Sequence, residues 1–341
     1  MCTNFLITAA DGSQIVGRSM ENATNFESQV VVRGRNQRIQ SPSDLDLLKH
    51  DGLAWTTAYG YVGLNALGMD WLTDGINEKG LSVGMLNLPG TQYQTVTDKT
   101  KALLVMWFCD WVLGNFATVA EVKAALPGVQ VWGPILESET TVHFPIFDAS
   151  GASIVVEFVG GAQRVHDNPV GVCTNAPTFD WHLANIGNYT GLSPWGADPV
   201  TIGGQTFAQP GLGSGLMGIP GDSTPPSRFV RVTYMKQFAD QPANAADGVT
   251  LAFHILNTVD IPLGTSRSRA ILHPIAGSQD STEWIVVRDL TNRVYYIRTY
   301  GNLTPMRIDL GKIPFATTTL LKQSLPALPP AVDITADVVP V

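Results

Sequence analysis

The first 22 residues place the strongest constraint on the fold of this chain. Residues 4–9 (Asn-Phe-Leu-Ile-Thr-Ala) favour a strand, and Asp11-Gly12 is a strong hairpin turn signal. Residues 13–20 can then return antiparallel to the first strand. This arrangement can bring Arg18 back beside Cys2, the second residue of the chain.

Cys2 stands where it can become an N-terminal nucleophile. Removal of Met1, which aminopeptidases favour when the next side chain is small, leaves a thiol and a free α-amine on adjacent carbons. Such an amine has a pKa of about 7.7–8.0, against roughly 10.4 for lysine, so it can accept a proton near neutral pH. A guanidinium at Arg18 would favour the thiolate form. The hairpin alone is also compatible with an inert terminal cysteine.

The composition excludes several classes of protein. The chain has 341 residues, 44% of them hydrophobic and only 15% charged, with 33 glycines and 22 prolines, which is typical of a globular protein rich in strands and loops. A net charge of −8 disfavours a nucleic-acid partner. No run of about 18 apolar residues indicates a membrane span. No histidines or cysteines pair at metal-ligand spacing, so we expect no metal and no cofactor.

The cysteine count argues against a disulfide framework. The chain has three cysteines, and Cys109 and Cys173 both lie in apolar stretches, where we expect them to be buried as small hydrophobic side chains.

The order of expected elements indicates an α+β fold. After the hairpin, strands run to residue 86. A helix is expected over residues 97–112, where Thr97 or Asp98 can cap it and apolar residues repeat at helical spacing. A second is expected over residues 118–127, where Thr118 and Glu121 form a capping box. Strands return over residues 141–174, helices over 179–188, 227–238 and 245–258, and strands over 283–309. Residues 191–226 are expected to form a long loop. This pattern predicts two antiparallel sheets sandwiched between helix layers, an αββα arrangement.

Three further features carry possible chemistry. The glycine motif at 213–218 matches G-x-G-x-x-G, but no strand precedes it and Pro220 interrupts the expected helix, which argues against a dinucleotide site. Asn175 ends an apolar strand and could donate to an oxyanion, or could satisfy its own turn. Arg228 opens a helix, where a cation opposes the helix dipole; it has either a functional role or a surface carboxylate as partner.

Several blocks of sequence together resemble the choloylglycine hydrolases, N-terminal-nucleophile (Ntn) hydrolases that include bile salt hydrolases and penicillin V acylases. The blocks occur in the family's order from residue 2 to about 230: Cys2-Thr3, Gly17-Arg18-Ser19-Met20-Glu21, Asp74-Gly75-Ile76-Asn77-Glu78-Lys79-Gly80-Leu81, Leu86-Asn87-Leu88-Pro89-Gly90, Thr174-Asn175-Ala176-Pro177-Thr178-Phe179, Pro220-Gly221-Asp222 and Pro226-Ser227-Arg228-Phe229. The closing hairpin from Glu283-Trp284 to Tyr300 is also similar, so the resemblance covers nearly the whole chain except the tail.

The resemblance implies a four-layer αββα Ntn-hydrolase sandwich and assigns a role to six residues. Cys2 would be the nucleophile and its α-amine the base, with Arg18 against the thiol. The two oxyanion donors would be the Asn175 side chain and the Asn87 main-chain N–H, and Arg228 would support the Cys2 site. The acid that holds the α-amine would be Glu21, where the family usually has Asp.

The implied activity is hydrolysis of the linear amide bond of an N-acyl substrate, such as a conjugated bile salt or penicillin V, through a thioester on Cys2. Asn87 favours the bile salt hydrolases, which tend to have Asn at that position, over the penicillin V acylases, which tend to have Tyr. Two alternatives stay open: a different reaction on the same fold, that of a transferase or an N-acyl-homoserine-lactone acylase, and a catalytically silent acyl-ligand binding protein that retains Met1. The expected walls of an apolar pocket are Ala23, Phe26, Trp71, Leu136 and Met217.

The domain and assembly expectations are simple. We expect one domain over residues 2–322 and a proline-containing tail over 323–341. The resemblance implies a homo-oligomer, a tetramer, with a small-molecule partner. The location would be cytoplasmic if Met1 is the native start, and periplasmic or secreted if a signal peptide was removed.

Overall fold

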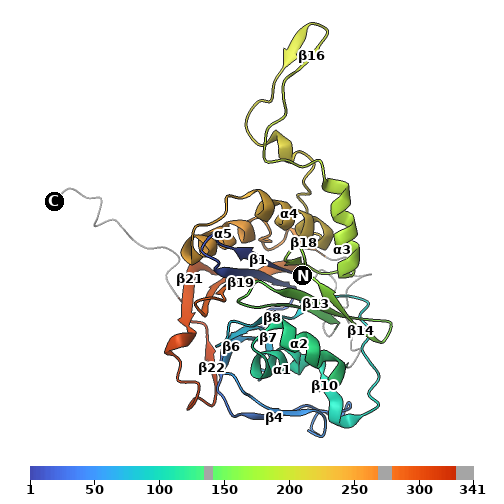
Figure 1. The fold of residues 1–341 in the computed structure, drawn as a ribbon, viewed down its shortest axis with the longest axis vertical. Coiled ribbons are helices and arrows are strands. Elements are labelled where there is room, and N and C mark those ends of the chain that lie inside the picture. Colours follow the sequence, from blue (N-terminus) through green and yellow to red (C-terminus); the bar gives the residue numbers. More distant parts are fainter. Residues whose placement is uncertain (134–140, 268–278, 328–341) are drawn as a thin grey trace, which may run out of the picture.

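The computed structural model describes residues 1–133, 141–267 and 279–327. Two antiparallel sheets lie face to face (Figure 1). Helices α4 (Pro225–Phe238) and α5 (Ala245–Asn257) cover the outer side of one sheet, and α1 (Phe108–Asn115) and α2 (Val119–Ala125) cover the outer side of the other. The predicted α+β sandwich is therefore confirmed.

In the first sheet, the N-terminal strand β1 lies between the short edge strand β15 and β2. Its order is β15-β1-β2-β19-β20-β21, with β18 paired to β19. Its strands are β1 (Cys2–Thr8), β2 (Gln14–Asn22), β15 (Val172–Cys173), β18 (Ser266–Arg267), β19 (Gln279–Asp289), β20 (Val294–Thr299) and β21 (Asn302–Asp309).

The second sheet has the order β14-β13-β12-β8-β7-β6-β3-β22, with β9 paired to β12. Its strands are β3 (Gln29–Arg33), β6 (Tyr61–Asn65), β7 (Leu72–Asn77), β8 (Ser82–Gly84), β9 (Leu86–Asn87), β12 (Val142–Phe147), β13 (Ser153–Val159), β14 (Ala162–Asp167) and β22 (Leu320–Ser324). Strand β22 therefore continues two residues into the segment expected to be a tail.

Three two-stranded ribbons and five α-helices complete the described chain. The ribbons pair β4 (Arg38–Gln40) with β5 (Ala54–Thr56), β10 (Ala102–Leu104) with β11 (Gln130–Trp132), and β16 (Val200–Ile202) with β17 (Gln205–Phe207). The helices are α1 (Phe108–Asn115), α2 (Val119–Ala125), α3 (Phe179–Ile186), α4 (Pro225–Phe238) and α5 (Ala245–Asn257).

The opening hairpin forms as its sequence predicts. The Ala9 N–H donates to the Ser13 carbonyl at 2.9 Å, and the Asp11 carboxylate accepts from the Ser13 N–H at 2.9 Å. Gly12 adopts φ +86°, a left-handed conformation that glycine reaches at little cost. The tight turn fixes the register of β1 against β2, so every residue of β1 has a defined partner.

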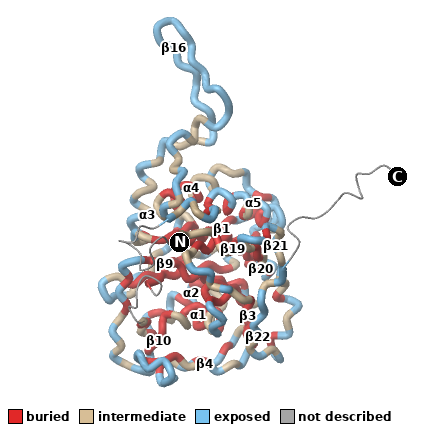
Figure 2. The backbone as a smooth tube through the Cα atoms, turned by 180° about the vertical axis from the view of Figure 1, so that it is seen from behind, coloured by how far each residue is buried: buried red, intermediate tan, exposed pale blue. Residues whose placement is uncertain are grey.

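The buried apolar side chains of the described residues form two large cores and one small cluster of Ala102, Leu104 and Trp132. One large core fills the space between the sheets and beneath α4 and α5, and the other lies between the second sheet and α1 and α2. Figure 2 shows the resulting bands of buried chain through the sheets, with exposed chain at the ends of the molecule.

The helix expected over residues 97–112 is wrong in its first half. Asp98 does cap a turn, because its side chain accepts from the Thr100 N–H, but the turn is a single 3₁₀ turn over Lys99–Lys101. Residues 102–104 then form β10, which pairs in parallel with β11. Helix α1 begins only at Phe108. The distant partner strand overrides the local helical spacing.

Residues 191–219 form an arm that projects far from the body (Figures 1 and 2). Its two ends meet at the base, where the Ser193 N–H donates to the Gly215 carbonyl at 2.9 Å. The β16–β17 ribbon lies toward its tip. The sequence predicts a loop here, since the two three-residue strands are too short to give a periodic signal.

Candidate active site

The hairpin register places Cys2 and Arg18 on the same face of the first sheet. Cys2 is paired with Met20, and Asn4 with Arg18, so these four side chains all point toward the second sheet. Cys2 is 2% exposed. Its Sγ lies 3.6 Å from the Met20 Sδ and 3.8 Å from the Arg18 Nη2. The predicted approach of Arg18 to the thiol is confirmed.

Arg18 is fully buried and held in one orientation by the second sheet. Its Nη1 lies 2.9 Å from the Asp74 carboxylate and donates to the Thr73 carbonyl at 2.5 Å. Its Nη2 donates to the Met85 carbonyl at 2.5 Å. Burial alone would lower the pKa of Arg18, but the neighbouring Asp74 and Cys2 outweigh it and raise the pKa. A permanent positive charge therefore faces the thiol.

Asp74 lies at the centre of this buried network, and the sequence interpretation gave it no role. It lies in the middle of β7, and its carboxylate contacts Arg18 and Arg288 at 2.9 Å each and accepts from the Tyr295 hydroxyl at 2.7 Å. These side chains are 0% exposed. The sequence does hold one indication of this network, which is an acidic residue between the apolar Leu72 and Ile76. A charge that is buried with such neighbours requires partners of opposite charge.

Asn175 lies on the main-chain side of Cys2. Its Oδ1 accepts from the Cys2 N–H at 2.7 Å and from the Arg228 Nη2 at 2.8 Å. Two donors on one atom identify it as the oxygen, so the other side-chain atom is the amide nitrogen. This Nδ2 donates to the Asn87 carbonyl at 2.7 Å. An amide nitrogen has two hydrogens, and the second is available to a substrate oxygen.

Arg228 connects helix α4 to the first strand. Its guanidinium donates to the Cys2 carbonyl, to the Thr3 Oγ1 at 2.5 Å and, through Nε, to the Ser223 carbonyl at 3.0 Å. Burial lowers the pKa of Arg228, while Glu21 and Cys2 act in the opposite direction. The cation in the first turn of α4 is therefore compensated by contacts to β1, which the sequence alone could not show.

Asn87 belongs to β9 and pairs with Val142. The neighbouring Leu88 N–H donates to the Thr141 carbonyl at 2.8 Å, so the Asn87–Val142 pair is the non-hydrogen-bonded kind. In such a pair the main-chain N–H and C=O point away from the partner strand. Both groups of Asn87 therefore point away from β12, and its C=O meets Asn175.

Glu21 is 1% exposed, and its Oε1 accepts from the Thr282 hydroxyl at 3.1 Å. Burial raises the pKa of Glu21, and Arg228 opposes the shift. Met1 is attached in this structure, and its ammonium contacts the Glu21 carbonyl and lies 3.5 Å from Asp280.

The expected pocket walls divide into three groups. Ala23, Phe26 and Trp71 are half-buried near the ends of β2 and β7, and Phe26 packs against the core. Met217 is 83% exposed at the base of the arm, away from a closed pocket. Leu136 lies outside the described residues.

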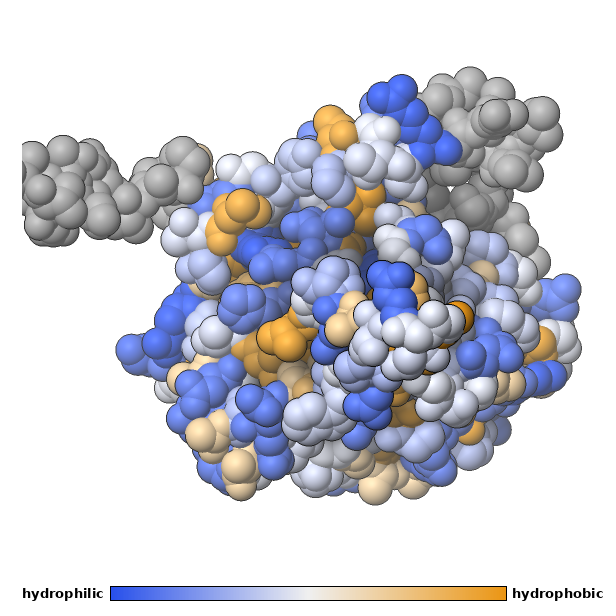
Figure 3. All heavy atoms as spheres, turned by 90° about the horizontal axis from the view of Figure 1, so that it is seen from above, coloured by the Kyte–Doolittle hydropathy of each residue, from blue (hydrophilic) through white to orange (hydrophobic). Residues whose placement is uncertain are grey.

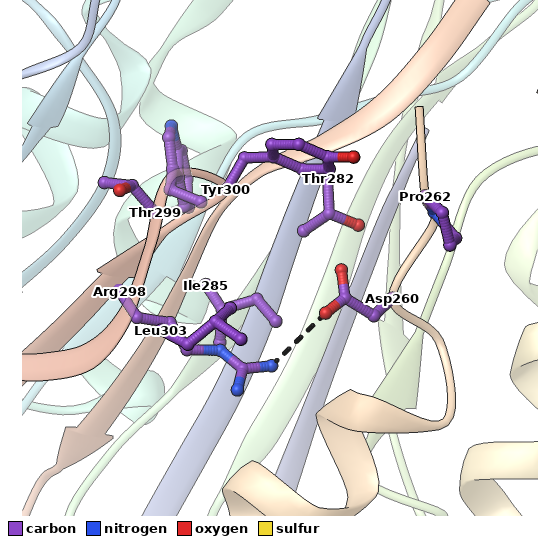
Figure 4. A pocket seen from close by; sticks show the side chains of 9 residues that line it. Asp260, Pro262, Thr282, Ile285, Arg298, Thr299, Tyr300 and Leu303 are labelled. Carbon is purple, nitrogen blue, oxygen red and sulfur yellow. Dashed lines mark ion pairs between the residues drawn. The ribbon is translucent and has the colours of Figure 1, made fainter. Parts of the chain in front are cut away.

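A cavity of about 300 Å³ lies beside the buried polar network (Figure 4). Two of its lining residues also contact the network. Thr282 donates to Glu21, and the Trp284 ring centroid lies 5.1 Å from the guanidinium carbon of Arg18. The side chains of Asp260 and Arg298 point toward one another at its wall, 3.5 Å apart. Its lining residues are Asp260, Pro262, Thr282, Trp284, Ile285, Arg298, Thr299, Tyr300 and Leu303.

Within the described ranges, no group of three or more His, Cys, Asp or Glu side chains lies together in a way that could hold a metal ion. In the same residues, no helix is both long enough and apolar enough to cross a membrane.

The chain matches known proteins over nearly its whole length. Residues 2–320 match the family model of the linear amide C–N hydrolases, choloylglycine hydrolase family. The chain is 36% identical to the bile salt hydrolase/transferase of Clostridium perfringens, covering 92% of this chain and 93% of that one. It is 31% identical to the penicillin V acylase of Pectobacterium atrosepticum, with 92% and 82% covered.

The similar solved structures agree. A variant of the conjugated bile acid hydrolase from Clostridium perfringens superposes with a TM-score of 0.85 at 30% identity, covering 98% of this chain and all of that one. Penicillin V acylase from Agrobacterium tumefaciens gives a TM-score of 0.78 at 25% identity, with 96% and 92% covered.

Asp74→Asn is expected to destabilise the protein by about 3–5 kcal/mol, because two guanidinium groups then stay buried with no carboxylate between them. Urea denaturation measures the loss. The matched control is Asp70→Asn, since Asp70 is half-exposed and pairs with Lys322 at the surface; it should cost at most about 1 kcal/mol. Equal, small losses in the two variants would contradict the assigned role of Asp74.

Glu283→Gln is expected to change how stability depends on pH. Burial raises the pKa of Glu283 to about 7, and its carboxylate accepts from the Phe26 N–H at 3.1 Å. An unfolded Glu titrates near a pKa of about 4.3. The folded chain thus retains a proton in the interval between, so this contribution is fully present below about pH 4.3 and is lost as pH rises through about 7.

Gln has no such titration. Urea denaturation at pH 5 and pH 8 should therefore show the wild type losing more stability than Glu283→Gln between the two pH values. A difference between the two proteins that is the same at both pH values would contradict the prediction.

Proposed function

The chain belongs to the choloylglycine hydrolase family, and we propose that it hydrolyses conjugated bile salts through a thioester on Cys2. It is a hydrolase of linear N-acyl amides. The observation that carries the proposal is the convergence on Cys2 of side chains from distant segments. Arg18 faces its thiol, Asn175 faces its nitrogen and Arg228 holds its carbonyl.

The proposed active form begins at Cys2. Removal of Met1 converts the Cys2 amide into an α-amine in the position where the amide N–H now donates to the Asn175 Oδ1. The amine can take the thiol proton, and Arg18 stabilises the resulting thiolate. The buried carboxyl of Glu21 lies near the terminus and is the acid proposed to hold this amine.

The bond changes then follow in order. The thiolate attacks the acyl carbon, and the Asn175 Nδ2 and the Asn87 N–H stabilise the oxygen that becomes negative. Each donor is worth about 3–4 kcal/mol in comparable sites. The Cys2 ammonium gives its proton to the leaving amine as the C–N bond breaks. Water then attacks the thioester, and the Cys2 α-amine takes a proton from this water and passes it to the departing sulfur. The acid is released and the Cys2 thiol is regenerated.

The substrate class rests on two supports. One is the 36% identity to a bile salt hydrolase/transferase over almost the full length of both chains. The other is the side chain at position 87, which is Asn, as in bile salt hydrolases, and not the Tyr that penicillin V acylases tend to have. The Asn87 carbonyl accepts from Asn175, and the Asn87 side chain donates to the Thr141 carbonyl at 3.1 Å. Penicillin V is the second candidate substrate because two penicillin V acylases are also similar to the chain.

A substrate panel tests the proposal. We expect glycocholate and taurocholate to be hydrolysed faster than penicillin V or a long-chain N-acyl-homoserine lactone, and the intact mass of the active protein to lack Met1. Cys2→Ala should abolish turnover with an unchanged unfolding transition. Full activity in a folded Cys2→Ala protein would rule out Cys2 as the nucleophile. A chain that keeps Met1 and binds these compounds without cleaving them would be a binding protein.

The arm supports a homo-oligomer, for which we propose a tetramer. Val200 and Ile202 on β16 and Phe207 on β17 lie on one face of the ribbon, and their exposures are 53%, 65% and 49%. Thr201 and Thr206 form the opposite face. Figure 3, which looks down on this end of the molecule, shows exposed hydrophobic side chains among hydrophilic ones. A one-sided apolar ribbon held away from the body is suited to another copy of the chain.

Replacing Val200, Ile202 and Phe207 by Ser should convert the protein to a single chain of 36.6 kDa, as measured by light scattering after size-exclusion chromatography. The control exchanges Thr201 and Thr206 for Ser on the opposite face and should keep a mass four times larger. A wild type that is itself monomeric, or a triple variant with unchanged mass, would contradict the proposal.

A further inference from the structure

Two buried histidines bind the main chain on either side of the Asn175 α-carbon. The Nε2 of His143, on β12, lies 2.8 Å from the Thr174 carbonyl oxygen. The Nε2 of His182, on α3, lies 2.8 Å from the Asn175 carbonyl oxygen. Each histidine is 1% exposed. Asn175 sits in the short link between β15 and α3, so no strand ladder fixes its position.

His143 is held in a state that donates from both ring nitrogens. Its Nδ1 lies 2.9 Å from the Glu157 Oε1. Burial alone would lower the pKa of His143, but Cys173 and Glu157 outweigh it and raise the pKa. A protonated ring donates to Glu157 at one side and to the Thr174 carbonyl at the other.

Glu157 links His143 to the helix that carries His182. It is 0% exposed, and besides His143 it accepts from the main-chain N–H of Phe179 at 3.0 Å. Phe179 is the first residue of α3, the helix that carries His182. One carboxylate therefore fixes the first histidine and the start of the helix that bears the second.

His182 is the neutral partner. Burial lowers the pKa of His182 to about 4, so at neutral pH the ring has one hydrogen, and the contact at Nε2 places it there, toward the Asn175 carbonyl. The ring stacks on Phe229 with centroids 4.7 Å apart and planes at 13°. The stack and the hydrogen bond fix its orientation independently.

We propose that His143 and His182 are positioning residues that hold the Asn175 main chain so that one Nδ2 hydrogen points at the reacting carbonyl. The proposal rests on the oxyanion role of Asn175 proposed above. Its Oδ1 has two donors, and Nδ2 gives one hydrogen to Asn87. These three contacts hold the amide end of the side chain, and the two histidines hold its main-chain end, so the direction of the second hydrogen depends on both. An error of 1 Å at such a site can cost about 100-fold in rate.

A pair of substitutions at His182 separates the hydrogen bond from the ring. His182→Phe keeps a ring to stack on Phe229 and removes the donor. His182→Gln loses the ring but places an N–H donor near the Nε2 position. We expect His182→Phe to lower kcat about 10–100-fold with little change in KM, since the donor acts on the transition state, and His182→Gln to regain most of that loss.

The alkylation rate of Cys2 by iodoacetamide provides the readout that a structural role would move differently. His182→Phe leaves Cys2 and Arg18 in place, so alkylation should keep the wild-type rate while turnover falls. Asn175→Ala is the reference variant, and adding His182→Phe to it should cause no further loss.

Each other outcome has a distinct meaning. Loss of turnover in Asn175→Ala with none in His182→Phe would overturn the positioning role and leave the oxyanion role standing. Alkylation that slows in parallel with turnover in His182→Phe would show a structural effect instead, and would also overturn the proposal. Unchanged turnover in Asn175→Ala would overturn the proposed oxyanion role itself.

Discussion

The buried contact of Asp74 with Arg18 and Arg288 is the interaction on which the rest of the site depends. Asp74 belongs to the second sheet and the two arginines to the first, so the contact sets how the sheets face each other. Two guanidinium charges against one carboxylate leave one positive charge uncompensated in the cluster. In the proposed mechanism, this positive charge stabilises the thiolate of Cys2, whose sulfur lies 3.8 Å from Arg18. The charges that join the two sheets are therefore the same ones that we propose to activate the nucleophile.

The hairpin could be predicted because all its determinants are local. Asp11 and Gly12 set the turn, and strand alternation then puts Arg18 on the Cys2 face without help from the rest of the chain. The segment around residue 100 shows the opposite case. Asp98 is a sound cap and the apolar spacing is helical, yet residues 102–104 form a strand because residues 130–132 lie beside them. No sequence pattern within either segment predicts that the two segments pair.

The same distinction runs through the site. Cys2, Asn175 and Arg228 could be named because several blocks resemble a family in the right order. Glu157, His143 and His182 could not, because a single buried histidine in a strand or helix looks like an ordinary core residue. Their meaning comes from contacts across 31 and 7 residues to two adjacent carbonyls, those of Thr174 and Asn175. Only the folded chain brings those carbonyls and rings together.

Several residues of the site are locally unfavourable where they stand. Asp74 is a charge in a buried strand, Arg228 is a cation in the first turn of a helix, and Glu157 is a fully buried carboxylate. Each is stabilised only by residues from other elements, so none of these arrangements is favourable until both sheets and helices α3 and α4 are in place. It follows that the geometry of the proposed site and the tertiary fold form together. A substitution that disturbs either sheet, α3 or α4 is therefore expected to displace Cys2 through a short series of hydrogen bonds.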